Sequence, residues 1–228
     1  LLELDPAARL REVVNSSEPL RATQLAHPLL QADTRVDNDV ALRGLGTALI
    51  VTGSNMAGKS TLLRAVGLNV ALALAGGPVC ANRMQVPYVR LRASMRAQDS
   101  LQQGASYFLA ELNKLRVVVR NLETDPPVLF LLDELLRGTN ERARHLGAKA
   151  VLMHLLDRGA TGLVATHDTK LALLEADYPN RVHNVHFTDI ERDGAMVFDY
   201  HVRPGIVQTS NALKLLALAG IEVAEEGA

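Results

Sequence analysis

The sequence predicts an α/β fold with a mainly parallel sheet flanked by helices. Three apolar runs of strand length, at residues 47–53, 128–134 and 161–166, support this prediction. Continuous apolar runs are typical of parallel strands that are buried on both faces. Helical periodicity follows each run, and strands that alternate with helices form parallel sheets covered on both sides.

The other elements follow from local signals along the chain. The sequence predicts a lead-in segment at residues 1–26, in which Pro6 and Pro19 interrupt any long helix, and the end of a preceding domain is the alternative. Residues 27–46 predict loop and short strands. The alternating residues 86–92 predict one strand. The segments 181–191 and 195–203 predict an antiparallel hairpin around Arg-Asp-Gly. The predicted helices are 58–74, 106–121, 138–159, 169–176 and 209–219.

The composition excludes several classes of protein. The net charge is −1, so a domain-wide basic surface for DNA is absent, and any DNA contact must be local or made by other segments. The single Cys80 excludes an internal disulfide and favours a reducing, cytoplasmic compartment. No apolar run reaches the roughly 18 residues of a membrane span. Because the chain begins with Leu1, we expect it to be part of a longer protein.

A glycine-rich loop follows the first apolar run. Gly53, Gly58, Lys59 and Ser60 fit the Walker A pattern G-x-x-x-x-G-K-[ST] of P-loop nucleotide-binding proteins. Backbone N–H groups of such a loop, and the N-terminus of the helix after it, bind phosphate. Lys59 would neutralise the β- and γ-phosphates, and Ser60 would bind Mg²⁺. The residues predicted to bind nucleotide here are Gly53, Ser54, Asn55, Met56, Ala57, Gly58, Lys59, Ser60 and Thr61.

Two acidic residues end the second apolar run. Asp133 can hold Mg²⁺ through a water molecule, and Glu134 can orient or deprotonate the attacking water. An acid pair at the end of a strand can also be merely solvated. Beside a phosphate-binding loop, however, the pair favours an ATPase that uses ATP and Mg²⁺.

These motifs resemble the ATPase domain of the MutS family of mismatch-repair proteins. The resemblance lies in residues 52–70 around the loop, 131–140 around the acids, and 164–168, "VATHD". It continues in "GASYFLAEL" at 104–112, in "RVDND" at 35–39, and in the closing segment from Tyr200 to Ile221. It covers residues 27–221 in the family's order, so it implies an ABC-ATPase-like P-loop domain over residues 27–228.

The sequence also departs from the family pattern. Ser54 stands where the family usually has Pro, and Ala57 where it usually has Gly. The segment after the acid pair reads "NERARHLG" instead of the usual Ser-Thr and Asp-Gly. Val36 stands where an aromatic residue commonly flanks adenine. The resemblance therefore implies a divergent member, whose substrate need not be a mismatch.

The resemblance implies roles for individual residues. Asn55 would reach the γ-phosphate or the attacking water, and Val36 would flank the adenine. His167 would sense the γ-phosphate from a neighbouring strand end, although a histidine there can also simply cap the next helix. Ser106 would contact the γ-phosphate bound by the other subunit, so that ATP joins two domains. A plain helix N-cap is the alternative for Ser106.

The sequence leaves three functions to weigh. The first is an ATPase, a homodimer when full-length, that drives conformational change in DNA-binding domains absent from this chain. The alternative is a nucleotide-gated dimerisation module of a membrane- or scaffold-associated protein with negligible hydrolysis, against which the intact Glu134 argues. An ABC-type transporter ATPase is a third, but no L-S-G-G-Q-like signature is present.

Overall fold

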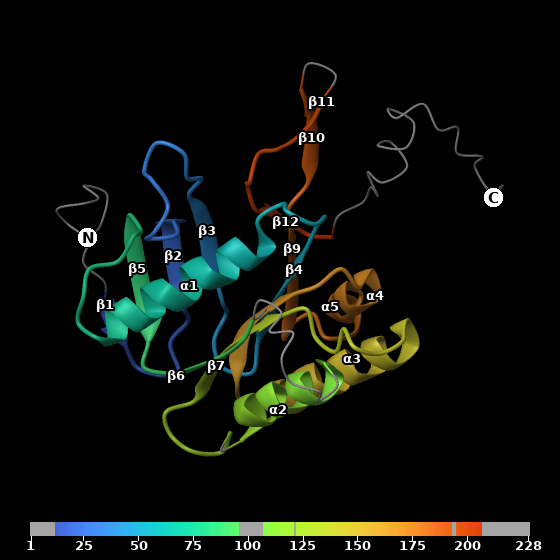
Figure 1. Ribbon diagram of the computed structural model, residues 1–228. Coiled ribbons are helices and arrows are strands. Elements are labelled where there is room, and N and C mark those ends of the chain that lie inside the picture. The colour runs from blue at the N-terminus through green and yellow to red at the C-terminus, as the bar shows by residue number, and fades with distance from the viewer. Residues whose placement is uncertain (1–11, 96–106, 121, 193–194, 207–228) are drawn as a thin grey trace.

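The computed structural model describes residues 12–95, 107–120, 122–192 and 195–206 (Figure 1). These residues form a mixed α/β fold with a six-stranded sheet and a four-stranded sheet. The six-stranded sheet has the order β12-β9-β4-β8-β7-β6, and all its neighbours are parallel except β12 and β9. Its strands are β12 Arg203–Pro204, β9 Val182–His186, β4 Ala48–Thr52, β8 Thr161–Ala165, β7 Val128–Asp133 and β6 Arg90–Ser94.

The four-stranded sheet has the order β1-β5-β2-β3, in which β1 and β5 are parallel and the other pairs antiparallel. Its strands are β1 Glu12–Val14, β5 Arg83–Pro87, β2 Arg21–Leu25 and β3 Asn38–Ala41. The strands β10 Asp189–Arg192 and β11 Ala195–Phe198 form a separate antiparallel hairpin. The helices are α1 Lys59–Leu74, α2 Tyr107–Val119, α3 Glu141–Asp157, α4 Thr169–Ala172 and α5 Leu174–Asp177.

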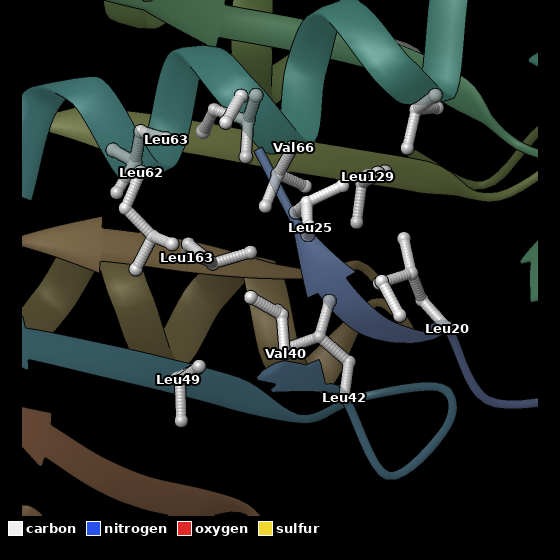
Figure 2. Close-up of a cluster of buried hydrophobic side chains, with 14 of the residues drawn as sticks. Leu20, Leu25, Val40, Leu42, Leu49, Leu62, Leu63, Val66, Leu129 and Leu163 are labelled. Carbon is white, nitrogen blue, oxygen red and sulfur yellow. The ribbon is translucent and has the colours of Figure 1, made fainter. Parts of the chain in front are cut away.

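The helices cover both faces of the six-stranded sheet because its strands are apolar on both faces. Leu49 and Val51 of β4 belong to one buried cluster with α1 and the four-stranded sheet. Ala48 and Ile50 belong to a second cluster with residues of α2, α3, α4 and α5. This alternation follows the period of two in a strand. Helix α1 therefore lies between the two sheets, and Figure 2 shows its leucines packed with residues of both.

The structure confirms most of the predicted elements and corrects three. Residues 86–92 do not form one strand, because the chain leaves β5 at Pro87 and enters the other sheet at Arg90. The hairpin is shorter than predicted, since β9 joins the parallel sheet and only β10 and β11 pair around the turn. The helix predicted at 169–176 divides into α4 and α5. The predicted helix 209–219 lies outside the described residues.

Among the described helices, none has both the length and the apolar character needed to cross a bilayer.

Candidate functional site

Three parallel strands end side by side at one edge of the six-stranded sheet. Val51 of β4 pairs with Ala165 of β8, and Ala165 pairs with Asp133 of β7. The segments that follow these three strands therefore leave the sheet at the same level. They are the Gly-rich loop, defined as residues 53–58, the residue Glu134, and the segment with His167. The carboxyl edge of a parallel sheet is where α/β proteins commonly bind ligands.

The Gly-rich loop needs its two glycines. Gly53 has φ of 131°, and a Cβ there would lie 2.6 Å from the carbonyl oxygen of Phe187. Gly58 has φ of 112° and precedes the first residue of α1. Both φ angles belong to the region that side chains disfavour. The chain can therefore turn sharply between β4 and α1 and bring the N-terminus of α1 to the sheet edge.

Lys59 is buried, and its ammonium group lies inside the curve of this loop. Its Nζ donates to the carbonyl oxygens of Gly53 and Ser54, both at 2.7 Å. The same Nζ lies 3.5 Å from Nδ1 of His167. The sequence prediction that places Lys59 and His167 in one site thus corresponds to a direct contact.

His167 links Lys59 to Glu134. Its Nε2 lies 2.6 Å from Oε1 of Glu134, whose side chain is 8% exposed. If Nε2 carries the proton and Nδ1 accepts from Lys59, both contacts are satisfied by one tautomer. A continuous polar chain therefore runs from the loop lysine through the imidazole to the second acid of the pair.

Glu134 occupies an unusual backbone conformation. Its φ is 58°, in the left-handed region that non-glycine residues rarely adopt, and its N–H donates to the carbonyl oxygen of Ala165 at 2.9 Å. Its Oε2 forms an ion pair with Arg137, three residues later. Such backbone conformations cluster at functional sites, where the surrounding structure stabilises them. Here the turn after β7 directs the carboxylate toward His167.

Asp133 is buried, and both its carboxylate oxygens lack a hydrogen-bond partner among the described residues. A buried carboxylate without partners is costly, so this position fits a cation or a water molecule bound to one. Ser60, the other predicted Mg²⁺ ligand, is half-buried in the first turn of α1. The described residues contain no cluster of three or more His, Cys, Asp or Glu side chains that would form a metal site by themselves.

A cavity of about 240 Å³ lies beside the start of α1. Val36, the predicted adenine neighbour, lines it together with Gly58 and Thr61 of the loop and helix. Two aromatic residues, Phe187 and Tyr200, also line it. The remaining lining residues are Leu25, Ala26, His27, Leu30, Thr34, Arg35, Asn38, Leu62 and Ala65. The surface of the cavity is largely apolar, although polar side chains also line it, as is typical of small-molecule sites.

The side chain of Asn38 ties two walls of this cavity together. The amide of Asn38 donates to the carbonyl oxygen of Tyr200 at 3.0 Å and accepts from the N–H of Val202 at 2.7 Å. Arg35 contributes to the lining a side chain that is only 6% exposed, and its Nε donates to Asp37 at 3.2 Å.

The histidine in the cavity lining, His27, has a pKa below its usual value. Burial is the main cause and the charge of Arg64 the second, and both favour the neutral imidazole.

The remaining predicted residues are distributed as follows. Ser54, Asn55 and Met56 are exposed on the loop, and Met56 is 84% exposed. Ala57 is buried against the core that α1 shares with the sheets. Ser106 lies outside the described residues.

Sequence reasoning missed three residues of this site. Arg137 follows the acid pair by three residues, and that short spacing was the available signal. Tyr200 is far from the loop in sequence and carries no local signal for the cavity, whereas Arg35 directly precedes Val36, the predicted adenine neighbour. Only the folded chain brings them beside Gly58.

Comparisons with a family model and with known proteins indicate the same family. A family model described as MutS domain V matches residues 49–225, more than half of the chain. The chain is 36% identical over 210 residues to the DNA mismatch repair protein MutS of Chloroflexus aurantiacus, which covers 89% of this chain and 21% of that protein. It is 34% identical over 198 residues to MutS of Thermotoga petrophila, which covers 86% of this chain and 25% of that protein.

A eukaryotic relative also matches. The chain is 35% identical over 187 residues to the DNA mismatch repair protein MSH3 of Yarrowia lipolytica, which covers 82% of this chain and 18% of that protein. The chain thus spans about a quarter or less of the length of these relatives. Taken with the matched model, these similarities establish that the chain belongs to the MutS family and contains its domain V.

Proposed function

We propose that this chain is a Mg²⁺-dependent ATPase, the C-terminal ATPase domain of a divergent MutS-related protein with an ABC-like P-loop fold. The observation that carries the proposal is the polar chain from Lys59 through His167 to Glu134. It joins a loop with the features of a phosphate site to a carboxylate with the features of a general base. Strand β8 lies between β4 and β7 in the sheet, so His167, which follows β8, lies between the Gly-rich loop and Glu134. This order of strands supports the proposal.

The Gly-rich loop and the N-terminus of α1 bind the phosphates in this proposal. Backbone N–H groups and the positive end of the 16-residue helix α1 attract the anion. Lys59 is already inside the loop, so its charge lies beside the phosphate chain without a large rearrangement. In this proposal Asn55, which is exposed on the loop, reaches the γ-phosphate, and Thr61, which lines the cavity, lies near the nucleoside.

Asp133 and Ser60 hold Mg²⁺ in this proposal. The two unpartnered oxygens of Asp133 fit this role, and Ser60 follows Lys59 in the first turn of α1. When bound, Mg²⁺ neutralises phosphate charge and orients the terminal phosphate.

Glu134 accepts the proton of the attacking water at its carboxylate, while His167 holds that carboxylate in place. The other ring nitrogen of His167 contacts Lys59, so the position of the imidazole responds when Lys59 binds phosphate. The ion pair with Arg137 partly balances the negative charge of Glu134 and holds its Oε2 atom in place. We therefore assign water activation to Glu134 and γ-phosphate sensing to His167 and Asn55.

The nucleoside lies in the cavity beside α1. A largely apolar cavity with two aromatic walls suits a purine, and Val36 would cover one side of the ring. This arrangement places base and phosphates at opposite sides of Gly58, which lines the cavity and ends the loop.

The wider proposal concerns parts beyond the described site. We propose residues 27–228 as the ATPase domain and residues 1–26 as its lead-in segment, of which β1 and β2 pair with strands of that domain. Ser106 completes the nucleotide site of a second subunit in a homodimer of the full-length protein. The relatives are named as DNA mismatch repair proteins. By analogy, hydrolysis would drive conformational change in DNA-binding domains that this chain lacks.

The test is the variant Glu134→Gln, compared with wild type and with Glu141→Gln. Glu141 lies in an exposed ion pair with Lys170 at the start of α3, so it controls for the loss of one carboxylate. We expect Glu134→Gln to keep the wild-type affinity for ATP, measured by calorimetry. Its rate of phosphate release should fall by roughly 10²-fold or more. Glu141→Gln should retain turnover.

Normal turnover in Glu134→Gln would contradict the mechanism. ATP binding without turnover in the wild-type full-length homodimer would favour the nucleotide-gated module instead.

A further inference from the structure

The Gly-rich loop is held from outside by the chain that enters the β10–β11 hairpin. The N–H of Phe187 donates to the carbonyl oxygen of Thr52 at 3.0 Å, directly before the loop. The carbonyl oxygen of Phe187 approaches Gly53 so closely that a Cβ there would lie 2.6 Å away. The loop and this segment are therefore packed backbone against backbone.

Two residues later, the same segment makes a side-chain contact with the loop. The hydroxyl of Ser54 donates to Oδ1 of Asp189 at 2.6 Å, and Asp189 is the first residue of β10. The carbonyl oxygen of Ser54 accepts from Nζ of Lys59. Ser54 thus joins Asp189 to the lysine that we assign to the phosphates.

The chain that leaves the hairpin holds the other end of the loop. Phe198, the last residue of β11, packs near Tyr200, with ring centroids 6.0 Å apart. A Cβ on Gly58 would lie 3.4 Å from the ring of Phe187 and 3.5 Å from the ring of Tyr200. Both stems of the hairpin therefore contact the loop, while Figure 1 shows the hairpin itself projecting from the two sheets.

The side chain of Ser54 depends on Asp189 for its position, because it is exposed and packing does not fix it. Ser54, Asn55 and Met56 are exposed, so packing does not fix the first turn of the loop. A carboxylate close to a phosphate site repels the ligand, so its presence there calls for a compensating role. Fixing Ser54 provides one, because backbone groups bind phosphate well only when they are already oriented.

We propose that Asp189 is a positioning residue of the Gly-rich loop, which acts through Ser54 and couples nucleotide binding to the β10–β11 hairpin. This inference rests on the proposed nucleotide site. Nucleotide that tightens the loop also tightens Ser54 against Asp189, and so stabilises the ladder in which Asp189 pairs with Phe198 and Ile190 with Val197. The hairpin then differs in stability between the nucleotide-bound and nucleotide-free states, although it does not line the phosphate site.

The test uses ADP with Mg²⁺ and the full 228-residue chain, with affinity measured by calorimetry. We expect Ser54→Ala, which keeps all charges, to weaken ADP binding about fivefold. Asp189→Asn retains an acceptor oxygen and should stay close to wild type. Thr188→Ala is the matched control, because its hydroxyl contacts only the backbone oxygen of Asp189 among the described contacts.

Hydrogen exchange provides a readout that a purely structural role would not change. In wild type, ADP should slow exchange of the β10 and β11 amides, and in Ser54→Ala and Asp189→Ala this response should be lost. Thermal unfolding of each variant checks that the chain is folded.

An unchanged affinity in Ser54→Ala, or a hairpin response that persists without the hydroxyl, would overturn the inference. If Asp189→Asn lowers the ADP affinity and the hairpin response as much as Asp189→Ala does, the charge of Asp189 and not its hydrogen bond to Ser54 is responsible. The inference is wrong in that case too. Failure of wild type to bind ADP or ATP would instead refute the proposed function.

Discussion

The two ends of the candidate nucleotide site are built in different ways. The phosphate end comes from three short motifs at the ends of adjacent parallel strands, namely residues 53–60, 133–134 and 167. The base end is a cavity with walls from distant segments, residues 25–38, 58–65 and 187–200. A motif that is contiguous in sequence specifies its own local geometry, whereas the cavity exists only after the two sheets pack around α1. The comparison suggests that chemistry resides at the first end and ligand selection at the second.

The largest effect should come from removing the charge at the phosphate end. Lys59→Met keeps most of the buried stem but loses the ammonium group that bridges the loop and His167. We expect ATP affinity to fall by about 10²-fold, because charge-assisted hydrogen bonds to phosphate are lost. Calorimetry measures the affinity, and Lys170→Met, which alters an exposed lysine, serves as the control. Unchanged ATP binding in Lys59→Met would show that the phosphates do not lie in this loop.

A smaller effect should follow at the base end. Tyr200→Ala removes one aromatic wall of the cavity, and we expect ADP affinity to fall about tenfold, as is typical of lost base stacking. Affinity for inorganic tripolyphosphate should fall much less, because Tyr200 contacts the loop only at Gly58, while Lys59 and its contacts in the loop remain. Tyr88→Ala is the matched control, because Tyr88 is an exposed tyrosine outside the cavity lining. An equal loss for ADP and tripolyphosphate would erase the distinction between the two ends.

The smallest effect concerns pH. Burial lowers the pKa of His27, with a contribution from Arg64, and burial lowers the pKa of His183, with a contribution from Arg43. The folded chain therefore binds fewer protons than the unfolded chain just below pH 6.5, so the free energy of unfolding rises with pH there. Stability is retained above pH 6.5 and lost as the pH falls toward the folded-state pKa values.

Urea unfolding at several pH values checks this pH dependence. Each half-buried histidine should contribute less than about 1 kcal/mol, because solvent screens its surroundings. His27→Gln should flatten the dependence, whereas His154→Gln, which alters an exposed histidine, should not. A His27→Gln profile identical to that of wild type would contradict the lowered pKa.

The sequence allowed prediction of the elements that carry the phosphate end. Strands β4, β7 and β8 are continuous apolar runs, and α1 follows a glycine turn, so local signals sufficed. The contact between Lys59, His167 and Glu134 depends on the order of three neighbouring strands. Sequence reasoning placed Glu134 in the site from the acid pair at the end of a buried strand, whereas the place of His167 came from the resemblance to the MutS family.

The four-stranded sheet and the cavity could not be predicted in the same way. Strands β1, β2 and β3 are short, and their burial patterns do not repeat, so tertiary pairing rather than propensity defines them. Tyr200 lies beside Gly58, and Asn38 of β3, more than 160 residues away in sequence, donates a hydrogen bond to its backbone oxygen. The break at Tyr88 escaped prediction because β5 and β6 together preserve an alternating pattern while they enter different sheets.

The most direct test of the account is calorimetric titration of the wild-type chain, with Mg²⁺, by ATP, adenosine and tripolyphosphate in turn. In the proposed site, one nucleotide spans both ends. We expect ATP to bind at least about tenfold more tightly than either fragment, because one molecule uses the loop and the cavity together. If tripolyphosphate binds as tightly as ATP, the cavity does not hold the base, and the central claim of a single site across Gly58 is wrong.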